Sequence, residues 1–201
     1  MSDMFTSAEN TALDDAITAC IRAFEKGGTL YICGNGGSAA DCQHIVGELM
    51  KGFQMKRPVS LPVKVRGSLS PETAVRLESS LQGALPAHAL TVETALISAL
   101  CNDIDADVVY AQQIYGYGKP GDVLLCISTS GNAENVVLAA ELAKAMGLTV
   151  VALTGRDGGK LAALCNIVIR AEADTTAEVQ QRHLPMYHRL CREVEAWFYK
   201  L

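Results

Sequence analysis

Two kinds of hydrophobic pattern alternate along the chain. Between residues 8 and 26, apolar side chains recur every three or four positions, which predicts an amphipathic helix that ends at Gly27 and Gly28. Other stretches are short and apolar at nearly every position, which is typical of strands buried on both faces. These stretches lie at 29–34, within 121–131, at 148–155 and at 166–171.

Loops and helical patterns follow these apolar stretches. We expect helices at about 38–50, within 133–147 and at about 176–199. Strand–loop–helix units at this spacing predict an α/β fold, in which one parallel sheet has helices on both faces. A single domain spanning 1–201 is expected from the chain length. An irregular segment richer in proline and charge predicts a surface excursion at about 59–84, with one short helix near 71–81.

Composition narrows the function classes. The chain has 49% hydrophobic residues and a formal net charge of -5, which favours a compact protein and argues against general binding to nucleic acid. Its seven cysteines contain no CxxC pair, so we expect reduced thiols in a cytoplasmic protein. The sequence shows no signal peptide pattern and no apolar run long enough to span a membrane.

Two loops rich in small polar residues are candidate phosphate sites. One follows the apolar run at 29–34 and contains Asn35, Gly36, Gly37 and Ser38; the other follows the run within 121–131 and contains Ser128, Thr129, Ser130 and Gly131. Both open a predicted helix, whose free N–H groups and dipole favour an anion. Each loop alone is also explained as a simple turn. Neither matches the GxxxxGK[ST] or GxGxxG pattern, so no nucleotide cofactor is expected.

Candidate acid–base or metal-binding residues occur on two of the predicted helices. His44 and Glu48 are four positions apart and share one helix face. Gln180 and His188 are eight positions apart, close to two turns, so they can also share a face. The alternative for His44 and Glu48 is an ordinary surface pair.

The motifs "GNGGSAAD", "ISTSGN" and "LTGRDGG", in this order, resemble the SIS (sugar isomerase) domain. The segments "QHIVGEL", "ND" at 102–103 and "TAEVQQRHLPMYHRLC" extend the resemblance over nearly the whole chain apart from 59–84. The chain is most similar to the phosphoheptose isomerase branch. The resemblance implies a flavodoxin-like or Rossmann-like α-β-α sandwich and an aldose–ketose isomerase that interconverts sedoheptulose 7-phosphate and D-glycero-D-manno-heptose 7-phosphate.

The resemblance also implies roles for individual residues. Glu48 and His188 correspond to the catalytic acid–base residues, and zinc, one ion per subunit, would be held by His44, Glu48, Gln180 and His188. Ala133 replaces a serine that often contacts phosphate in the family, and Gln181 replaces a glutamate. The implied substrate-binding residues are Asn35, Gly36, Gly37, Ser38, Asn102, Asp103, Ser128, Thr129, Ser130 and Gln180.

Two alternatives to this isomerase stay open. Related branches are regulatory proteins that bind a sugar phosphate or a replication initiator without catalysis; because such relatives tend to lose the second histidine, His188 favours an enzyme. Ala133 and the 59–84 excursion leave open an isomerase for another sugar phosphate. The other histidines have smaller predicted roles: His183 supports the site or faces substrate at most, and His88 is structural.

Family members assemble as tetramers, which gives an expectation for this chain. We expect a homotetramer in which the helix at 8–26 and the last helix form a central bundle. Gln180 and His188 would then complete a site shared with a neighbouring chain.

Overall fold

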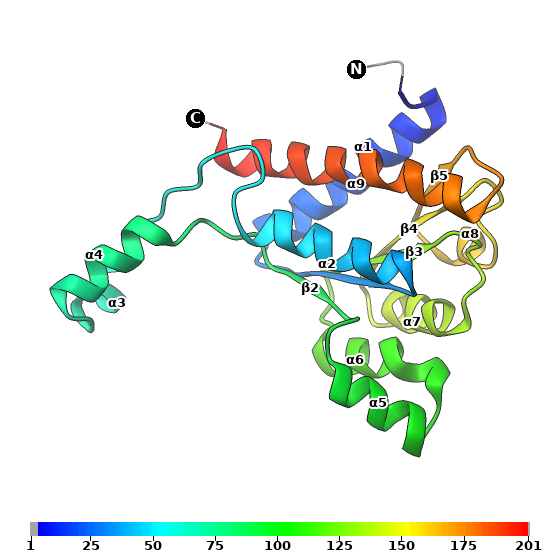
Figure 1. The fold of residues 1–201 in the computed structure, drawn as a ribbon, viewed down its shortest axis with the longest axis horizontal. Helices are drawn as coiled ribbons and strands as arrows, with labels where there is room; N and C mark the ends of the chain where they lie inside the picture. Colours follow the sequence, from blue (N-terminus) through cyan, green and yellow to red (C-terminus); the bar gives the residue numbers. More distant parts are fainter. Residues whose placement is uncertain (1–3, 201) are drawn as a thin grey trace.

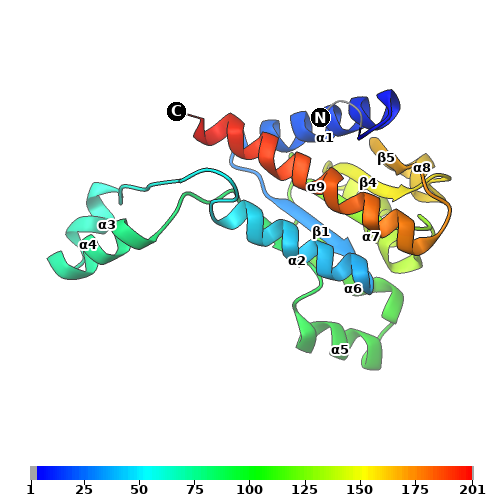
Figure 2. The same cartoon turned by 45° about the horizontal axis from the view of Figure 1, so that its top comes forward.

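The computed structural model describes residues 4–200, which form one five-stranded sheet with helices on both faces (Figures 1 and 2). All strand pairs are parallel, in the order β2-β1-β3-β4-β5. The elements are α1 (Ser7–Glu25), β1 (Leu30–Gly34), α2 (Gly37–Met50), α3 (Val63–Gly67), α4 (Pro71–Ser80), β2 (Ala87–Ala89), α5 (Thr94–Asp103), the 3-10 helix η1 (Ala106–Val108), α6 (Val109–Tyr117), β3 (Val123–Ser128), α7 (Glu134–Ala145), β4 (Thr149–Gly155), α8 (Leu161–Leu164), β5 (Ile167–Ala171) and α9 (Thr176–Tyr199). The predicted α/β fold is confirmed.

Alternating side chains of the strands pack into two hydrophobic cores, one on each face of the sheet. In β1, Leu30 and Ile32 enter the core under α1, α2 and α9, whereas Tyr31 and Cys33 enter the core under α5, α6 and α7. Every residue of β1 and β3 is buried. This explains why these strands appear in the sequence as continuous apolar runs, because a parallel sheet covered on both faces has no polar side.

The strand order places a topological switch point between β1 and β3. From β1 the chain crosses to β2 on one side, and from β3 it crosses to β4 on the other. Where the connections after two neighbouring strands lead to opposite sides of those strands, a crevice forms at the carboxyl ends of the strands. Proteins with an α/β fold bind ligands in this crevice. The two candidate phosphate loops follow β1 and β3, so the fold brings them to this crevice.

The long helices begin at well-formed caps. Thr6 and Glu9 form a capping box at the start of α1, and Thr175 and Glu178 form another at the start of α9. Glu9 is also 2% exposed and accepts two hydrogen bonds from Arg182, at 2.7 and 2.9 Å. This ion pair fixes α1 against α9 and therefore holds α9 in register over the sheet.

The predicted surface excursion is an arm that stands away from the body (Figures 1 and 2). We define the arm as residues 59–81, which include α3 and α4. The expected helix near 71–81 is confirmed as α4, whereas α3 was not expected. Ala74 is the only buried residue of the arm, and Val63 is 89% exposed. The arm therefore has almost no core of its own.

Candidate active site

Asn35 joins the two candidate phosphate loops. Its side-chain amide exchanges two hydrogen bonds with Asn135 at the start of α7, at 2.8 and 3.1 Å. The Tyr110 hydroxyl donates to the Gly34 carbonyl, at 2.6 Å, and its oxygen also lies 3.0 Å from Asn35 Oδ1. The structure therefore places Asn35 at the crevice but uses its side chain to tie the loop after β1 to the helix after β3.

The second loop borders a cavity of about 300 Å³ at the carboxyl ends of β3 and β4. Thr129 and Ser130 line this cavity together with Thr175 and Thr176 at the start of α9. Ser130 is exposed, whereas Ser128 is 7% exposed and is the last residue of β3. Neutral hydroxyl groups at helix starts suit a phosphate in a protein of net negative charge.

Gly131 allows the second loop to approach its neighbour closely. Its φ is +66°, and a Cβ at this position would lie 2.0 Å from the Gly158 carbonyl oxygen. No other residue fits there, because both the backbone conformation and the space exclude a side chain. The close contact packs the loop after β3 against the loop after β4 and shapes the cavity.

Arg156 is a cavity residue that the sequence analysis did not single out. It follows β4 directly and lines the same cavity as Ser130. Its guanidinium pairs with Glu172 at 2.8 Å and Asp174 at 3.0 Å. Its position after the end of a parallel strand, in the quoted motif "LTGRDGG", was a signal that could have identified it.

The first loop also receives Gln180 from α9. A Cβ on Gly37 would lie 2.6 Å from Gln180 Nε2, so the end of the Gln180 side chain is in close contact with this glycine. Gln180 therefore lies at the start of α2, beside the candidate phosphate loops. The structure places it with Gly37 rather than with His44 and Glu48.

His44 and Glu48 face each other from successive turns of α2. His44 Nε2 lies 3.1 Å from Glu48 Oε1, and the two side chains are 42% and 15% exposed. The His188 ring of α9 packs edge-on against the His44 ring, with a centroid separation of 5.0 Å. The expected association of these three side chains from two helices is present in the structure.

The surroundings of His188 favour its neutral form. Burial lowers its pKa, and the nearby His44 lowers it further, against the opposing effect of Glu48. His188 Nε2 is buried and has no hydrogen-bond partner within residues 4–200. A neutral ring with an unpartnered nitrogen is suited to exchange protons or to bind a metal.

The donor types around His44 suit zinc, since two imidazoles and a carboxylate are common ligands of this ion. The unpartnered His188 Nε2 is consistent with such a role. In the described part of the chain, however, no three His, Cys, Asp or Glu side chains converge in an arrangement that could hold a metal. The Gln180 side chain lies beside Gly37, so the expected four-residue set is not assembled in this structure.

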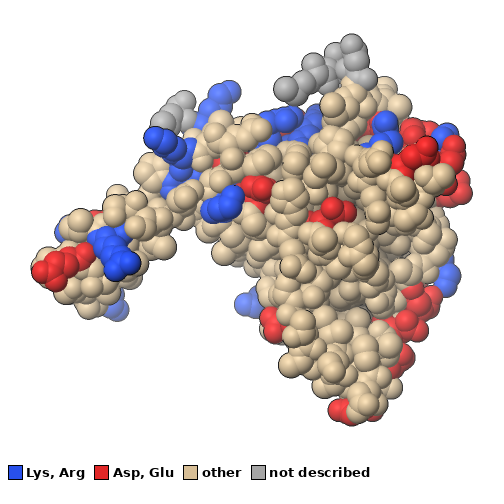
Figure 3. Space-filling view, in the orientation of Figure 1, with Lys and Arg blue, Asp and Glu red and all other residues tan. Residues whose placement is uncertain are grey.

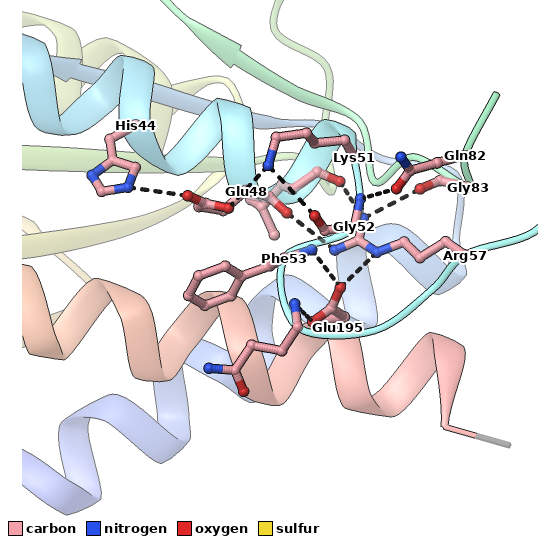
Figure 4. Close-up of polar contacts among 11 residues, drawn as sticks. His44, Glu48, Lys51, Gly52, Phe53, Arg57, Gln82, Gly83 and Glu195 are labelled. Atoms are coloured by element: carbon pink, nitrogen blue, oxygen red, sulfur yellow. Dashed lines mark hydrogen bonds and ion pairs between the residues drawn. The ribbon is translucent and has the colours of Figure 1, made fainter. Parts of the chain in front are cut away.

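Arg57 and Glu195 support the end of α2 that carries Glu48 (Figure 4). The two side chains are fully buried and pair at 2.9 Å. Arg57 also donates to the carbonyls of Glu48, at 3.1 Å, and Leu49, at 2.6 Å. The carboxylate of Glu195 accepts from the N–H groups of Phe53 and Gln54, each at 2.8 Å.

The charge of Glu195 is maintained despite its position inside the protein. Burial alone would raise its pKa, but the hydrogen bonds from Gln54, Phe53 and Arg57 outweigh burial and lower the pKa. The pair is therefore an ionised link between α9, the end of α2 and the start of the segment that leads to the arm.

Other predicted residues lie away from His44. Asn102 and Asp103 are exposed at the end of α5, where the Asn102 amide donates to the Asp103 carboxylate at 2.6 Å. Ala133 is the N-cap of α7 and makes no side-chain capping bond. Its methyl group leaves the first N–H groups of α7 without a hydroxyl partner at this position.

The remaining histidines are packed against the sheet. His183 is fully buried and its Nε2 lies 3.1 Å from the Thr154 carbonyl. Burial lowers the pKa of His183 to about 4, and its burial excludes the substrate-facing role that the sequence left open. His88 packs edge-on against Tyr31 and Tyr117, consistent with a structural role.

Tyr187 and Asp41 also border His44, and the sequence analysis assigned no role to either. Tyr187 Oη lies 3.0 Å from His44 Nδ1 and donates to Asp41 Oδ1 at 3.2 Å. Asp41 is one turn before His44 on α2, a spacing that could have identified it. Tyr187 directly precedes His188 in the sequence. The pattern of apolar residues in this helix does not show that the Tyr187 hydroxyl will contact the His44 ring of another helix.

Comparisons with known proteins test the family that the motifs resemble. A family model described as the SIS domain matches residues 1–80 and 78–155. A phosphoheptose isomerase of Akkermansia muciniphila is 35% identical over 201 aligned residues, which cover 99% of this chain and 93% of that relative. This chain belongs to the phosphoheptose isomerase family.

Within residues 4–200 no helix has both the length and the apolar character needed to cross a membrane.

Solved structures of phosphoheptose isomerases share the fold of this family member. One from Francisella tularensis is 33% identical, with a TM-score of 0.76 over 92% of this chain and 85% of that chain. One from Neisseria gonorrhoeae is 32% identical, with a TM-score of 0.74 over 92% of this chain and 86% of that chain. The SIS resemblance and the isomerase branch that the motifs implied are therefore both confirmed.

Proposed function

We propose that this protein is a cytoplasmic aldose–ketose isomerase that interconverts sedoheptulose 7-phosphate and D-glycero-D-manno-heptose 7-phosphate. One observation carries the proposal. His44, Glu48 and His188 gather on α2 and α9, and α2 begins at the switch point between two phosphate-type loops. Membership of the phosphoheptose isomerase family supports the substrate. The seven cysteines are all free, which suits a reducing compartment.

The phosphate group is bound at the carboxyl edge of the sheet. Thr129 and Ser130 supply hydroxyl groups beside the start of α7, and Ser38 stands in the first turn of α2. These groups are neutral, so the helix starts provide the favourable potential. The bonds between Asn35 and Asn135 hold the two loops at a fixed separation. This fixes the distance from the bound phosphate to α2.

The reaction moves one carbon-bound and one oxygen-bound proton between neighbouring carbons of the sugar. Glu48 removes the proton from C1 of the ketose, which forms the enediol, and returns it to C2. His188 transfers the proton between the oxygens on C1 and C2. Burial lowers the pKa of His188, which favours the neutral ring that can accept and return a proton.

Zinc is part of the proposal as one ion per subunit, held by His44, Glu48, Gln180 and His188. A bound zinc ion would polarise the sugar carbonyl and stabilise the charge of the enediol. The donor types and the unpartnered His188 Nε2 support this set. Metal analysis of purified protein measures the zinc content directly.

Conversion of sedoheptulose 7-phosphate tests the reaction. The purified protein is incubated with phosphates of sedoheptulose, fructose and ribulose, and the products are followed by NMR. We expect an aldose product from sedoheptulose 7-phosphate at the highest rate. Conversion of another ketose phosphate alone would change the substrate, and binding without conversion would indicate a regulatory sugar-phosphate-binding protein.

Replacing Ser130 with alanine is expected to weaken substrate binding. Loss of one hydroxyl that donates to a charged phosphate removes about 1.5 kcal/mol or more, which raises KM roughly tenfold. The kcat should change little, because the phosphate is remote from the reacting carbons and is bound equally in the ground and transition states. Steady-state kinetics measure both constants. Ser79→Ala on the arm is the control, and an unchanged KM in Ser130→Ala would contradict the phosphate site.

We also propose that the protein is a homotetramer. Helices α1 and α9 pack side by side on the outside of the molecule, and α9 exposes Leu184 by 41% and Trp197 by 62%. Figure 3 shows few charged side chains over the middle of the face between the arm and α5. Such surfaces favour association with further copies.

Light scattering coupled to size-exclusion chromatography tests the assembly. We expect about four times the 21.4 kDa chain mass at micromolar concentration. Trp197→Glu places a charge on the outer face of α9 and should shift the protein toward smaller species. A wild-type protein that elutes as a monomer would contradict the tetramer.

A further inference from the structure

Four side chains form a row of close contacts across α2 and α9. Asp41 Oδ1 and Tyr187 Oη are 3.2 Å apart, Tyr187 Oη and His44 Nδ1 are 3.0 Å apart, and His44 Nε2 and Glu48 Oε1 are 3.1 Å apart. Figure 4 shows the last of these contacts. Asp41 and Tyr187 have no role in the mechanism above.

Counting hydrogens shows what this row lacks. Each of its three contacts needs one hydrogen or one cation between the two heavy atoms. Both carboxylates only accept hydrogen bonds, Tyr187 supplies one hydrogen and a neutral His44 supplies one. Two hydrogens cannot satisfy three contacts. The row is complete only when one further positive centre is present, either a second hydrogen on the His44 ring or a cation.

Burial indicates where the positive centre belongs. Tyr187 is 2% exposed and Asp41 is half-buried, so this end of the row is the more enclosed one. The His44 side chain is 42% exposed, which makes the contact between His44 and Glu48 the open one. Tyr187 donates to Asp41, a charge-assisted hydrogen bond, and its oxygen then accepts from His44 Nδ1. The lone pair of His44 Nε2 consequently points at the Glu48 carboxylate.

We infer that Asp41 and Tyr187 are positioning residues for His44: they keep its ring hydrogen on Nδ1, so that Nε2 and the Glu48 carboxylate bind a divalent cation together. Metal-bound histidines usually donate their other ring N–H to a carboxylate or another acceptor, which fixes the ring and strengthens the metal bond. Here the phenol of Tyr187 is that acceptor and Asp41 orients the phenol. This inference rests on the zinc-binding part of the proposed function.

Zinc affinity of the metal-stripped protein tests the inference. Competition with a chromophoric chelator gives the affinity of the wild type, of Tyr187→Phe and of Asp41→Asn. Both variants should bind zinc about 10- to 100-fold more weakly than the wild type. Tyr31→Phe is the matched control, because it removes the hydroxyl group of a buried tyrosine that donates to the Tyr117 carbonyl instead. Equal affinity in Tyr187→Phe and the wild type would overturn the inference, as would a wild type that binds no zinc.

Histidine NMR tests the tautomer directly. With ¹⁵N-labelled histidine, zinc should shift the Nε2 signal of His44 while Nδ1 keeps its hydrogen, and Tyr187→Phe should lose this preference. A zinc-induced shift of Nδ1 instead would overturn the inference. Neither measurement uses a sugar. A protein that gives both expected results but converts no sugar phosphate would therefore contradict the proposed reaction and leave the metal inference standing.

Discussion

Replacing Glu48 with glutamine is expected to lower kcat for sedoheptulose 7-phosphate by about 100- to 10,000-fold. The substitution keeps the size of the side chain but removes the carboxylate that accepts the C1 proton. His188→Gln should have an effect of similar size, because it removes the group that moves the oxygen-bound proton. Single-turnover and steady-state assays of purified variants measure both effects.

The loss in these variants must be separated from a loss of folding. Glu48 is 15% exposed in its side chain and its partner His44 is largely open to solvent, so the glutamine should be accommodated with little change in melting temperature. Glu72→Gln, at the exposed start of α4, is the matched control and should retain full activity. If Glu48→Gln and His188→Gln both isomerise the sugar at the wild-type rate, the catalytic assignment is wrong.

Replacing Arg57 with methionine is expected to lower the free energy of unfolding by about 3–5 kcal/mol. The variant leaves the buried carboxylate of Glu195 without its counter-charge, leaves the Glu48 carbonyl without its guanidinium donor, and leaves the Leu49 carbonyl with only the Leu85 N–H. Urea denaturation monitored by circular dichroism measures the change. The double variant Arg57→Met/Glu195→Leu should lose less than the single variant, because it removes both charges from the interior.

A surface ion pair supplies the control for this prediction. Arg66 and Glu78 on the arm pair at 3.2 Å with side chains 55% and 25% exposed. Arg66→Met should cost no more than about 1 kcal/mol, since water screens such pairs. If Arg57→Met is no more destabilising than Arg66→Met, the buried pair does not hold the end of α2 as described.

The sequence predicted the elements in which apolar residues recur at a regular spacing. The helix expected at 176–199 is α9, Thr176–Tyr199, and it continues through Pro185 although proline removes a backbone donor. The capping box at Thr175 and the buried apolar face around Tyr187 and Leu190 stabilise this helix on both sides of the proline. Periodicity was a stronger signal here than the single proline.

Two elements that the sequence did not predict, β2 and α5, have weak patterns. Strand β2 has three residues, only one of which is fully buried, so it lacks both length and alternation. Helix α5 buries Leu100 alone. One buried position gives no periodic pattern that the sequence could reveal. These elements form because the crossover from α2 to β3 must cover the edge of the sheet, which is a tertiary constraint.

The candidate site was predictable where its residues are close in sequence. The spacing of His44 and Glu48 is a local property, and the structure confirms their contact. Contacts over long sequence separations were not predictable, because a helical period identifies a face but not the helix that it meets. Asn35 and Asn135 are 100 residues apart, and His44 and Tyr187 are 143 residues apart.

The ends of the arm are fastened to each other at the body. Pro58 and Gln82 form an antiparallel bridge, and the Gly83 N–H donates to the Arg57 carbonyl at 2.8 Å. Because both ends leave the sheet-bearing body at one point, the arm can lengthen, shorten or change sequence without altering the register of any strand. This junction is thus a natural insertion site, through which evolution or an engineer can attach new recognition elements while the catalytic framework stays the same.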